Sequence, residues 1–206
     1  MPPGHSRPFR DPLSKEVNID TTRSLDRFPV RVFLCGPEIK AGRRAKQKNR
    51  QTDLRVFIKS KLASEMKRCI VRLGEHKEMI RAYTEATGRR ASNLANHEFS
   101  LVTNKMDVVI IFPSSPGSFA ELGMFCLAGQ VAEKLRIIID MEFKKSKGYV
   151  MLGPVKAAEQ NNAKVVFVNY RKRLDVWHEV RELVLEVKAK KRMRRLIGQW
   201  NSNVRG

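Results

Sequence analysis

Five short apolar runs divide the chain between residues 30 and 168, and the stretches between them are long enough to hold helices. The runs are rich in β-branched residues, and three of them end at a glycine or a proline, which is typical of buried strands. Strands that alternate with helices predict right-handed crossovers and a parallel sheet covered on both faces. We therefore expect a three-layer α/β/α fold. The runs are VRVFLC (30–35), CIVRL (69–73), DVVIIF (107–112), LRIII (135–139) and KVVFV (164–168).

Apolar residues recur at helical spacing between these runs. Leu54, Ile58 and Leu62, for example, predict a helix over about 51–67. Further helices are expected over about 92–105, from about Phe119, shortly before the fifth strand, and over 175–197.

Composition divides the chain into three parts. Residues 1–28 are rich in proline, arginine and aspartate without periodicity, so we expect a flexible arm. Residues 29–170 form the α/β domain, and residues 171–206 form a basic C-terminal helix. A chain of 206 residues with 42% hydrophobic content suits one domain with two such appendages.

No apolar run approaches the ~18 residues needed to cross a bilayer, and the N-terminus lacks the apolar segment of a signal peptide. Three cysteines, Cys35, Cys69 and Cys126, are far apart and lack metal-ligand spacing. We therefore expect a cytoplasmic protein with no membrane contact, no metal and no cofactor.

Lysine and arginine outnumber aspartate and glutamate by 41 to 21, a formal net charge of +20, which favours binding to polyanions such as nucleic acids. The charge gathers in two acid-free clusters, at 40–50 and at 188–195. Neither cluster contains an aromatic residue, so we expect contacts to phosphates and not to bases. Cations near a helix C-terminus also favour the helix dipole, which is a structural alternative for the second cluster. The predicted nucleic-acid-binding residues are Arg43, Arg44, Lys46, Lys48, Arg50, Lys190, Lys191, Arg192, Arg194 and Arg195.

In an open parallel sheet, ligands bind beyond the carboxyl ends of the strands. This rule places the residues that follow the predicted strands in a cleft, whereas Asp107 lies at the other end of its strand, where we expect a structural role. The cleft residues are Gly36, Pro37, Glu38, Gly74, Glu75, His76, Asp140 and the segment from Pro113 to Gly117.

The loop FPSSPGSFAELG (112–123) joins a buried strand to a helix and carries the most informative motif. We expect Ser118 at the helix N-cap, where backbone N–H groups and the helix dipole favour an anion or a sugar hydroxyl. Glu121 allows two interpretations: a catalytic carboxylate, or the partner of Ser118 in a capping box. Ser114 and Ser115 are expected to place hydroxyls near the ligand, because no nucleophile elbow surrounds them.

The string MDVVIIFPSSPGSFAELGMF resembles the nucleoside 2-deoxyribosyltransferase-like family, and specifically the effector proteins of bacterial retrons, which act in phage defence. Three further segments support the resemblance, which covers roughly residues 30–170. They are RVFLCG (31–36), LGEH (73–76) and EFKKSKGYVMLGPV (142–155).

The resemblance implies a flavodoxin-like (Rossmann-like) fold, which we expect in the strand order 2-1-3-4-5, and a glutamate, Glu121, that attacks the anomeric carbon of a ribosyl group. Such a carboxylate can trap the oxocarbenium-like state of N-glycoside cleavage. Nicotinamide leaves without a proton, which fits NAD as substrate, whereas a purine needs a general acid such as Glu75 or Glu38. Asn96 and Glu98 correspond to a polar pair of the family that reaches the sugar.

The resemblance also implies partners and leaves alternatives. A reverse transcriptase in complex with reverse-transcribed DNA is expected to restrain the toxic activity, and a homo-oligomer is left open. Retron effectors of this type continue into a winged-helix domain, whereas this chain has a basic helix, so any nucleic-acid contact is expected at 40–50 and 171–206. One alternative is a catalytically idle nucleotide-binding module docked on nucleic acid. Another is a nucleoside-monophosphate ribohydrolase, although the loop lacks the PGGxGT pattern.

Overall fold

The computed structural model describes residues 24–37, 50–74 and 93–204. It contains a five-stranded sheet in the order β2-β1-β3-β4-β5, and every strand is parallel to its neighbours. The predicted fold and strand order are confirmed. The strands are β1 (Val30–Cys35), β2 (Cys69–Arg72), β3 (Val108–Ile111), β4 (Leu135–Asp140) and β5 (Lys164–Val168).

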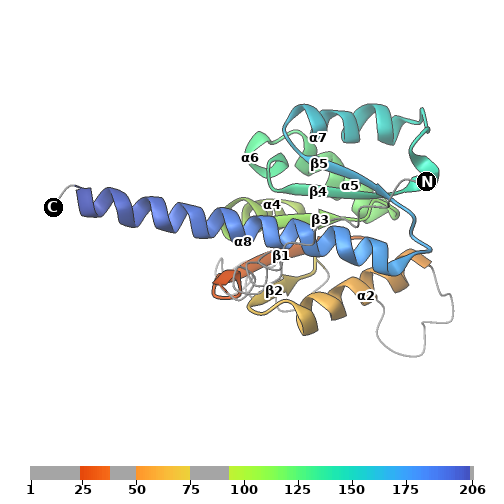
Figure 1. Cartoon of the computed structure of the whole chain (residues 1–206). Helices are drawn as coiled ribbons and strands as arrows, with labels where there is room; N and C mark the ends of the chain where they lie inside the picture. The colour runs from red at the N-terminus through yellow and green to blue at the C-terminus, as the bar shows by residue number, and fades with distance from the viewer. Residues whose placement is uncertain (1–23, 38–49, 75–92, 205–206) are drawn as a thin grey trace, which may run out of the picture.

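Helices cover both faces of the sheet (Figure 1). Alternate residues of a strand point to opposite faces, so Val32 and Leu34 of β1 enter one core while Phe33 and Cys35 enter the other. The first core is closed by α2 (Arg50–Glu65) and α8 (Arg173–Val204). The second is closed by α4 (Leu94–Lys105), α5 (Pro116–Cys126), α6 (Gly129–Ala132) and α7 (Lys156–Gln160), with the short helices η1 (Met141–Phe143) and η2 (Met151–Val155) before α7.

The predicted last helix is longer than expected. Its apolar stripe from Val176 to Val187 packs on the sheet, and its C-terminal end projects past the rest of the molecule (Figure 1). The described helices include none that is both long enough and apolar enough to cross a membrane.

The end of the predicted arm belongs to the folded body. Ser24 and Leu25 form a helical turn, and Leu25 is buried. The Asp26 carboxylate accepts a hydrogen bond from Lys188 at 3.3 Å. The flexible arm that the sequence predicts up to residue 28 is therefore wrong for residues 24–28; residues 1–23 lie outside the described part.

The basic run of α8 is only partly a free surface, contrary to the prediction. Lys188 is fully buried, where its ammonium group also donates to the Lys67 carbonyl at 2.8 Å. Lys191 donates to Asp107 at 2.6 Å, and Arg192 donates to Ser24 at 2.7 Å. These three cations bind groups at the amino ends of the strands and in the segment before β1. The exposed members of the run are Lys190, Arg194 and Arg195.

Asp107 has the structural role that was predicted. Its carboxylate accepts the backbone N–H of Arg31 at 2.8 Å and the ammonium group of Lys191. The side chain thereby ties β1, the start of β3 and α8 together at the amino ends of the strands.

Candidate active site

A cavity of about 360 Å³ opens at the carboxyl ends of β1, β2 and β3, where the parallel-sheet rule places a ligand. Its volume is in the range of small-molecule sites, roughly 300–1,000 Å³. We name it the carboxylate pocket, because two glutamates lie in its wall. It is lined by Gly36, Gly74, Leu94, Glu98, Ser115, Gly117, Ser118 and Glu121.

The start of α5 differs from the prediction by three residues. Ser115, and not Ser118, is the N-cap, and Pro116 occupies the first helical position, which suits a residue without an N–H group. Ser118 is the third helical residue and completes a capping box with Ser115: the Ser115 hydroxyl accepts the Ser118 N–H at 3.3 Å, and the Ser118 hydroxyl accepts the Ser115 N–H at 2.9 Å. The earlier cap prediction is therefore wrong.

This correction changes the interpretation of Glu121. The first turn of α5 contains no acidic residue, so Glu121 lies one turn further along and takes no part in the capping box. Its side chain is instead half-buried in the wall of the carboxylate pocket. Of the two interpretations that the sequence left open, the capping role is excluded.

Gly74 shows how closely the two glutamates approach each other. A Cβ atom built on Gly74 would lie 2.5 Å from Glu98 Oε1 and 3.3 Å from Glu121 Oε1. The two oxygen atoms can therefore be no farther apart than the sum of these distances, 5.8 Å. Glu98 is only 8% exposed, and it reaches the pocket from α4, one turn before the buried Val102. A glycine at position 74 leaves the space that both carboxylates share.

The buried thiol of Cys35 interacts with Glu121. Burial raises the pKa of the Cys35 thiol well above its usual value, and the Glu121 carboxylate raises this pKa further through its charge and a hydrogen bond with the thiol. A thiol that is held protonated is a donor and not a nucleophile. Cys35 thus orients one carboxylate of the pocket, a role that the sequence analysis did not predict.

The turn after β1 is held by a buried arginine of α2. Gly36 has φ of 153°, a conformation that favours glycine, and a Cβ atom there would lie 3.0 Å from Arg55 Cδ. The Arg55 guanidinium donates to the carbonyls of Leu34 at 2.6 Å, Pro37 at 2.7 Å and Gly36 at 3.2 Å. Arg55 therefore fixes the rim of the pocket opposite α5. Arginine in a solvent-exposed helix is common, and its burial was not predictable from spacing.

The other predicted substrate-binding residues are distributed around this pocket. Pro37 is buried under the rim, and the Ser118 hydroxyl is used within the loop, where it also accepts the Ser114 N–H at 2.9 Å. Asn96 is exposed on α4 and does not line the carboxylate pocket; its backbone N–H donates to the side chain of the N-cap residue Asn93 at 3.1 Å. Pro113 lines a separate pocket. Residues predicted from the sequence that lie outside the described part are Glu38, Glu75, His76, Arg43, Arg44, Lys46 and Lys48, and only the backbone of Arg50 is described.

An apolar pocket of about 260 Å³ lies on the other side of the α5 loop. Pro113 and Phe119 from the loop face Ile139 at the end of β4, and Phe143 and Tyr149 complete it with the start of η2. Phe119, Phe143 and Tyr149 are exposed. The segment from Pro113 to Glu121 thus borders both the carboxylate pocket and this apolar pocket.

Within the described residues, no cluster of histidine, cysteine, aspartate or glutamate is suited to hold a metal ion. The site is defined by its paired carboxylates, its helix N-terminus and its position at the carboxyl edge of a parallel sheet.

Fold and pocket together define an α/β protein with an acidic pocket at the switch between β1 and β3. Residues 51–203 match the family model described as STM3845 retron effector protein, and the chain belongs to this family. Two curated relatives from Escherichia coli are similar. "Retron Ec86 putative ribosyltransferase/DNA-binding protein" is 39% identical over 67 residues, 32% of this chain and 22% of that protein. "Retron Ec73 putative ribosyltransferase/DNA-binding protein" is 32% identical over 89 residues, 38% of this chain and 28% of that protein. The aligned stretches therefore span about a quarter of these relatives.

Proposed function

We propose that this retron effector protein cleaves the N-glycosidic bond of a nucleotide, with Glu121 as the nucleophile and NAD as the substrate. The observation that carries the proposal is the pair of carboxylates, Glu121 and Glu98, that face one small space above Gly74. The ribosyltransferase part of both relatives' names supports glycosyl transfer as the reaction class. The nucleoside deoxyribosyltransferase-like resemblance of the loop at 112–123 supports the same assignment.

The separation of the carboxylates favours a double displacement. Paired carboxyl groups about 5–5.5 Å apart are typical of enzymes that form a covalent glycosyl intermediate, whereas roughly 6.5–9.5 Å leaves room for a water molecule between sugar and base. Glu98 Oε1 and Glu121 Oε1 are no more than 5.8 Å apart, which is below the roughly 6.5 Å at which the second class begins.

The reaction then has two steps. A Glu121 carboxylate oxygen bonds to C1′ of the ribosyl group as the C1′–N bond breaks, and the bonding electrons neutralise the pyridinium nitrogen, so nicotinamide leaves without a proton. In the second step a water molecule, or another hydroxyl acceptor, attacks C1′ and displaces Glu121. Glu98 accepts the proton of the incoming hydroxyl. The Cys35 hydrogen bond holds the Glu121 side chain beneath the sugar.

The remaining walls suit the other parts of a nucleotide. Gly117, near the start of α5, offers backbone N–H groups and the positive end of a helix dipole to a phosphate. The apolar pocket beside Phe119 offers a surface to a planar base.

In a cell, this activity would be the toxic arm of a phage-defence retron, held back by a complex of reverse transcriptase and reverse-transcribed DNA. The DNA-binding part of the relatives' names and the net charge of +20 support a nucleic-acid contact by this chain. The competing function is a nucleotide-binding module without catalysis. Such a module would bind a nucleotide in the same pocket but would form no product.

The test is release of free base from NAD and from nucleotides by Glu121→Gln and Glu98→Gln proteins, followed by chromatography. Glu179→Gln on the exposed surface of α8 is the matched control. The proteins are assayed alone and with the reverse transcriptase–DNA complex, before and after its disruption. Glu121→Gln should reduce base release by at least about 1,000-fold, in line with the loss of a nucleophile, with an unchanged unfolding midpoint. Base release by Glu121→Gln at the rate of the control would reject the nucleophile, and wild-type protein without any product would favour the binding module.

A further inference from the structure

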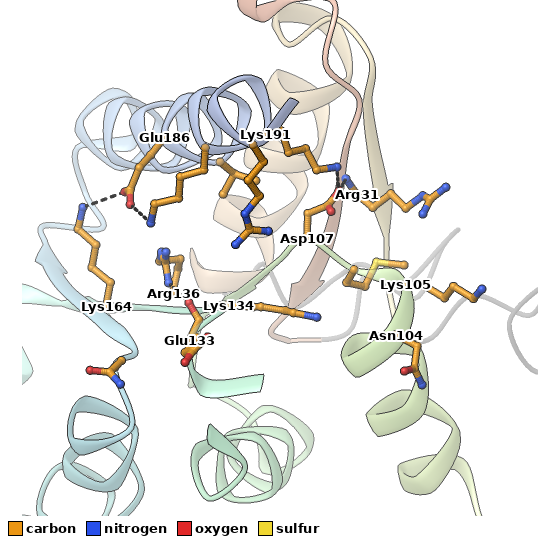
Figure 2. A pocket seen from close by; sticks show the side chains of 15 residues that line it. Arg31, Asn104, Lys105, Asp107, Glu133, Lys134, Arg136, Lys164, Glu186 and Lys191 are labelled. Atoms are coloured by element: carbon orange, nitrogen blue, oxygen red, sulfur yellow. Dashed lines mark hydrogen bonds and ion pairs between the residues drawn. The ribbon is translucent and has the colours of Figure 1, made fainter. Parts of the chain in front are cut away.

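A second cavity, of about 670 Å³, lies at the amino ends of the strands. The carboxylate pocket lies at their carboxyl ends. The second cavity is enclosed by α8, the end of α4 and the starts of β4 and β5 (Figure 2). Eight of its fifteen lining residues are lysine or arginine, and three are acidic. We name it the cationic cleft.

Two of the three acidic residues of the cleft, Glu186 and Asp107, form ion pairs with lysines. Glu186 binds Lys190 at 2.7 Å and Lys164 at 3.6 Å, and Asp107 binds Lys191 (Figure 2). Three exposed cations of the lining form no ion pair with another described residue: Arg31 on β1, Lys105 at the end of α4, and Arg194 on α8. They come from three different elements that line the cleft.

The floor of the cleft holds a buried guanidinium with unused hydrogen-bonding capacity. Arg136, on β4, is 6% exposed, and Figure 2 shows it between the sheet and α8. Its Nη1 donates to the carbonyls of Glu133 at 2.8 Å and Leu135 at 3.0 Å, whereas its Nε has no partner in the described structure. The Nε atom is buried below the surface of the cleft, so Arg136 would act on an anion there through its positive charge and not through this atom.

We propose that the cationic cleft binds the phosphate backbone of a nucleic acid. Arginine forks and ammonium groups from three elements suit phosphate oxygens, and the lining includes no aromatic residue on which a base could stack. The exposed Arg194 and Arg195 continue the positive charge along the projecting end of α8. A polyanion that extends past the cleft can contact both of these arginines, whereas a single small anion in the cleft cannot.

The position of the cleft separates this nucleic acid from the active site. On β1, Arg31 lines the cleft and Gly36 lines the carboxylate pocket. Five residues of an extended strand span about 16 Å. Phosphates held at the cleft are therefore away from Glu98 and Glu121, whose charges would repel them. The nucleic acid bound here is a docking partner and not the substrate of Glu121. The inference extends the nucleic-acid part of the proposed function and is independent of the carboxylate chemistry.

The experiment measures the salt dependence of DNA binding by fluorescence anisotropy, with labelled 20-nucleotide single strands and duplexes of arbitrary sequence. The test variant combines Arg31→Gln, Lys105→Gln and Arg194→Gln. The matched control combines Lys144→Gln, Lys145→Gln and Lys147→Gln, which removes the same charge from exposed positions outside the cleft. Three lost phosphate contacts should make the log–log slope shallower by about 2.7 for a duplex and about 2.1 for a single strand. The control should keep the wild-type slope.

Arg136→Lys probes the floor separately, because lysine keeps the positive charge but lacks the planar guanidinium with its several N–H donors. It should weaken DNA binding at every salt concentration, measured at a temperature well below the unfolding midpoint, because the change also removes the hydrogen bonds to the Glu133 and Leu135 carbonyls. Equal loss in the test and control variants would overturn the inference in favour of a general charge effect. Displacement of DNA by inorganic phosphate or by poly-glutamate at equal anion concentration would overturn it in favour of a small-anion or an acidic-protein site. Base release by the test variant without DNA should equal that of wild type, so a failed cleft and a failed active site give different results.

Discussion

Replacing Gly74 with alanine tests whether the shared space above this residue is needed for chemistry. The new Cβ atom would lie 2.5 Å from Glu98 Oε1, well inside the 3.4 Å at which ordinary contacts begin, so the oxygen has to retreat by about 0.9 Å. The Glu121 oxygen, at 3.3 Å, hardly has to move. The substitution therefore displaces one carboxylate of the pair and leaves the other in place.

The expected effect on activity is large and the effect on stability is small. A misplacement of about 1 Å in a catalytic group costs on the order of 100-fold in rate, or about 2.7 kcal/mol of activation free energy. The group that must move is the end of a flexible side chain beside an open pocket, so the strain in the folded state is small. Alanine also lowers the conformational entropy of the unfolded chain, which offsets about 0.4–1 kcal/mol of any loss.

The assay compares kcat for base release with the free energy of unfolding in urea. Gly123→Ala, in the second half of α5, is the control, since a Cβ atom there meets nothing within 4 Å. It should raise stability by about 0.5–1 kcal/mol and leave kcat unchanged. A Gly74→Ala protein with wild-type kcat would refute the reasoning that Glu98 acts from this position. A protein destabilised by several kcal/mol would refute the claim that only a side-chain end is displaced.

Two further predictions concern stability. Lys188→Ala should cost about 2–4 kcal/mol in urea unfolding, because it removes a fully buried stem and two charged hydrogen bonds, whereas Lys190→Ala on the exposed face should stay within about 0.5 kcal/mol of wild type. Tyr170 is buried and donates its hydroxyl hydrogen to the Ile138 carbonyl, so Tyr170→Phe should cost about 1 kcal/mol near neutral pH. Burial raises the pKa of Tyr170 in the folded state, so the stabilisation is complete below the unfolded pKa of about 10 and is lost as the pH rises above it. The difference between wild type and Tyr170→Phe should therefore shrink above pH ~10; a constant difference would show that the phenol is not held protonated by folding.

The sheet was predictable from the sequence because every strand is an apolar run, and three of the five runs are followed by a glycine or a proline. The run VVII of β3, for example, is apolar on both faces, as a central parallel strand must be, and Pro113 follows within two residues. The helices between the strands were also predictable in place, although α8 extends beyond the range that its apolar stripe marks, to Val204. An apolar stripe predicts the part of a helix that packs on the core, but it does not predict how far the exposed end continues.

The predicted N-terminus of α5 was wrong because the loop contains two serines that could each be the N-cap of a capping box. Ser118 with Glu121 and Ser115 with Ser118 both fit a capping box, and spacing alone does not separate them. Pro116 could have decided the matter, since proline favours the first helical position and places the cap one residue earlier. With the N-cap at Ser115, Glu121 lies beyond the capping box, and its side chain lines the pocket.

The burial of charged residues was harder to predict because a basic run resembles a solvated face. Lys188 and Lys191 follow Val184 and Val187 at a spacing of four, so they continue the buried stripe of α8. Glu98 stands in the same relation to Val102 on α4. The spacing was visible in the sequence, but the partners that make burial favourable, such as Asp26, lie far away in the chain.

The carboxylate pair also constrains how a nucleotide can lie in the pocket. If a nucleotide binds the carboxylate pocket as proposed, the two glutamates would repel its phosphates, so we expect the ribose above Gly74 and the phosphates toward Gly117, at the positive end of α5. A Cβ atom at Gly117 meets nothing within 4 Å, so side chains fit there without displacing the fold. Gly117→Asp and Gly117→Asn then differ by one negative charge at nearly equal shape.

If phosphates lie at the start of α5, the aspartate variant should bind NAD more weakly than the asparagine variant. Two charges about 5 Å apart near a protein surface interact by roughly 1–3 kcal/mol, which corresponds to a KM for NAD raised by about 5- to 150-fold. A nucleoside without phosphate should show the same KM with both variants, since the added charge has nothing to repel. The aspartate is not expected to unfold the helix, because a negative charge in the first turn favours the dipole by about 0.3–1 kcal/mol. Equal KM values for NAD in the two variants would place the phosphates elsewhere, and with them the ribose that Glu121 is proposed to attack.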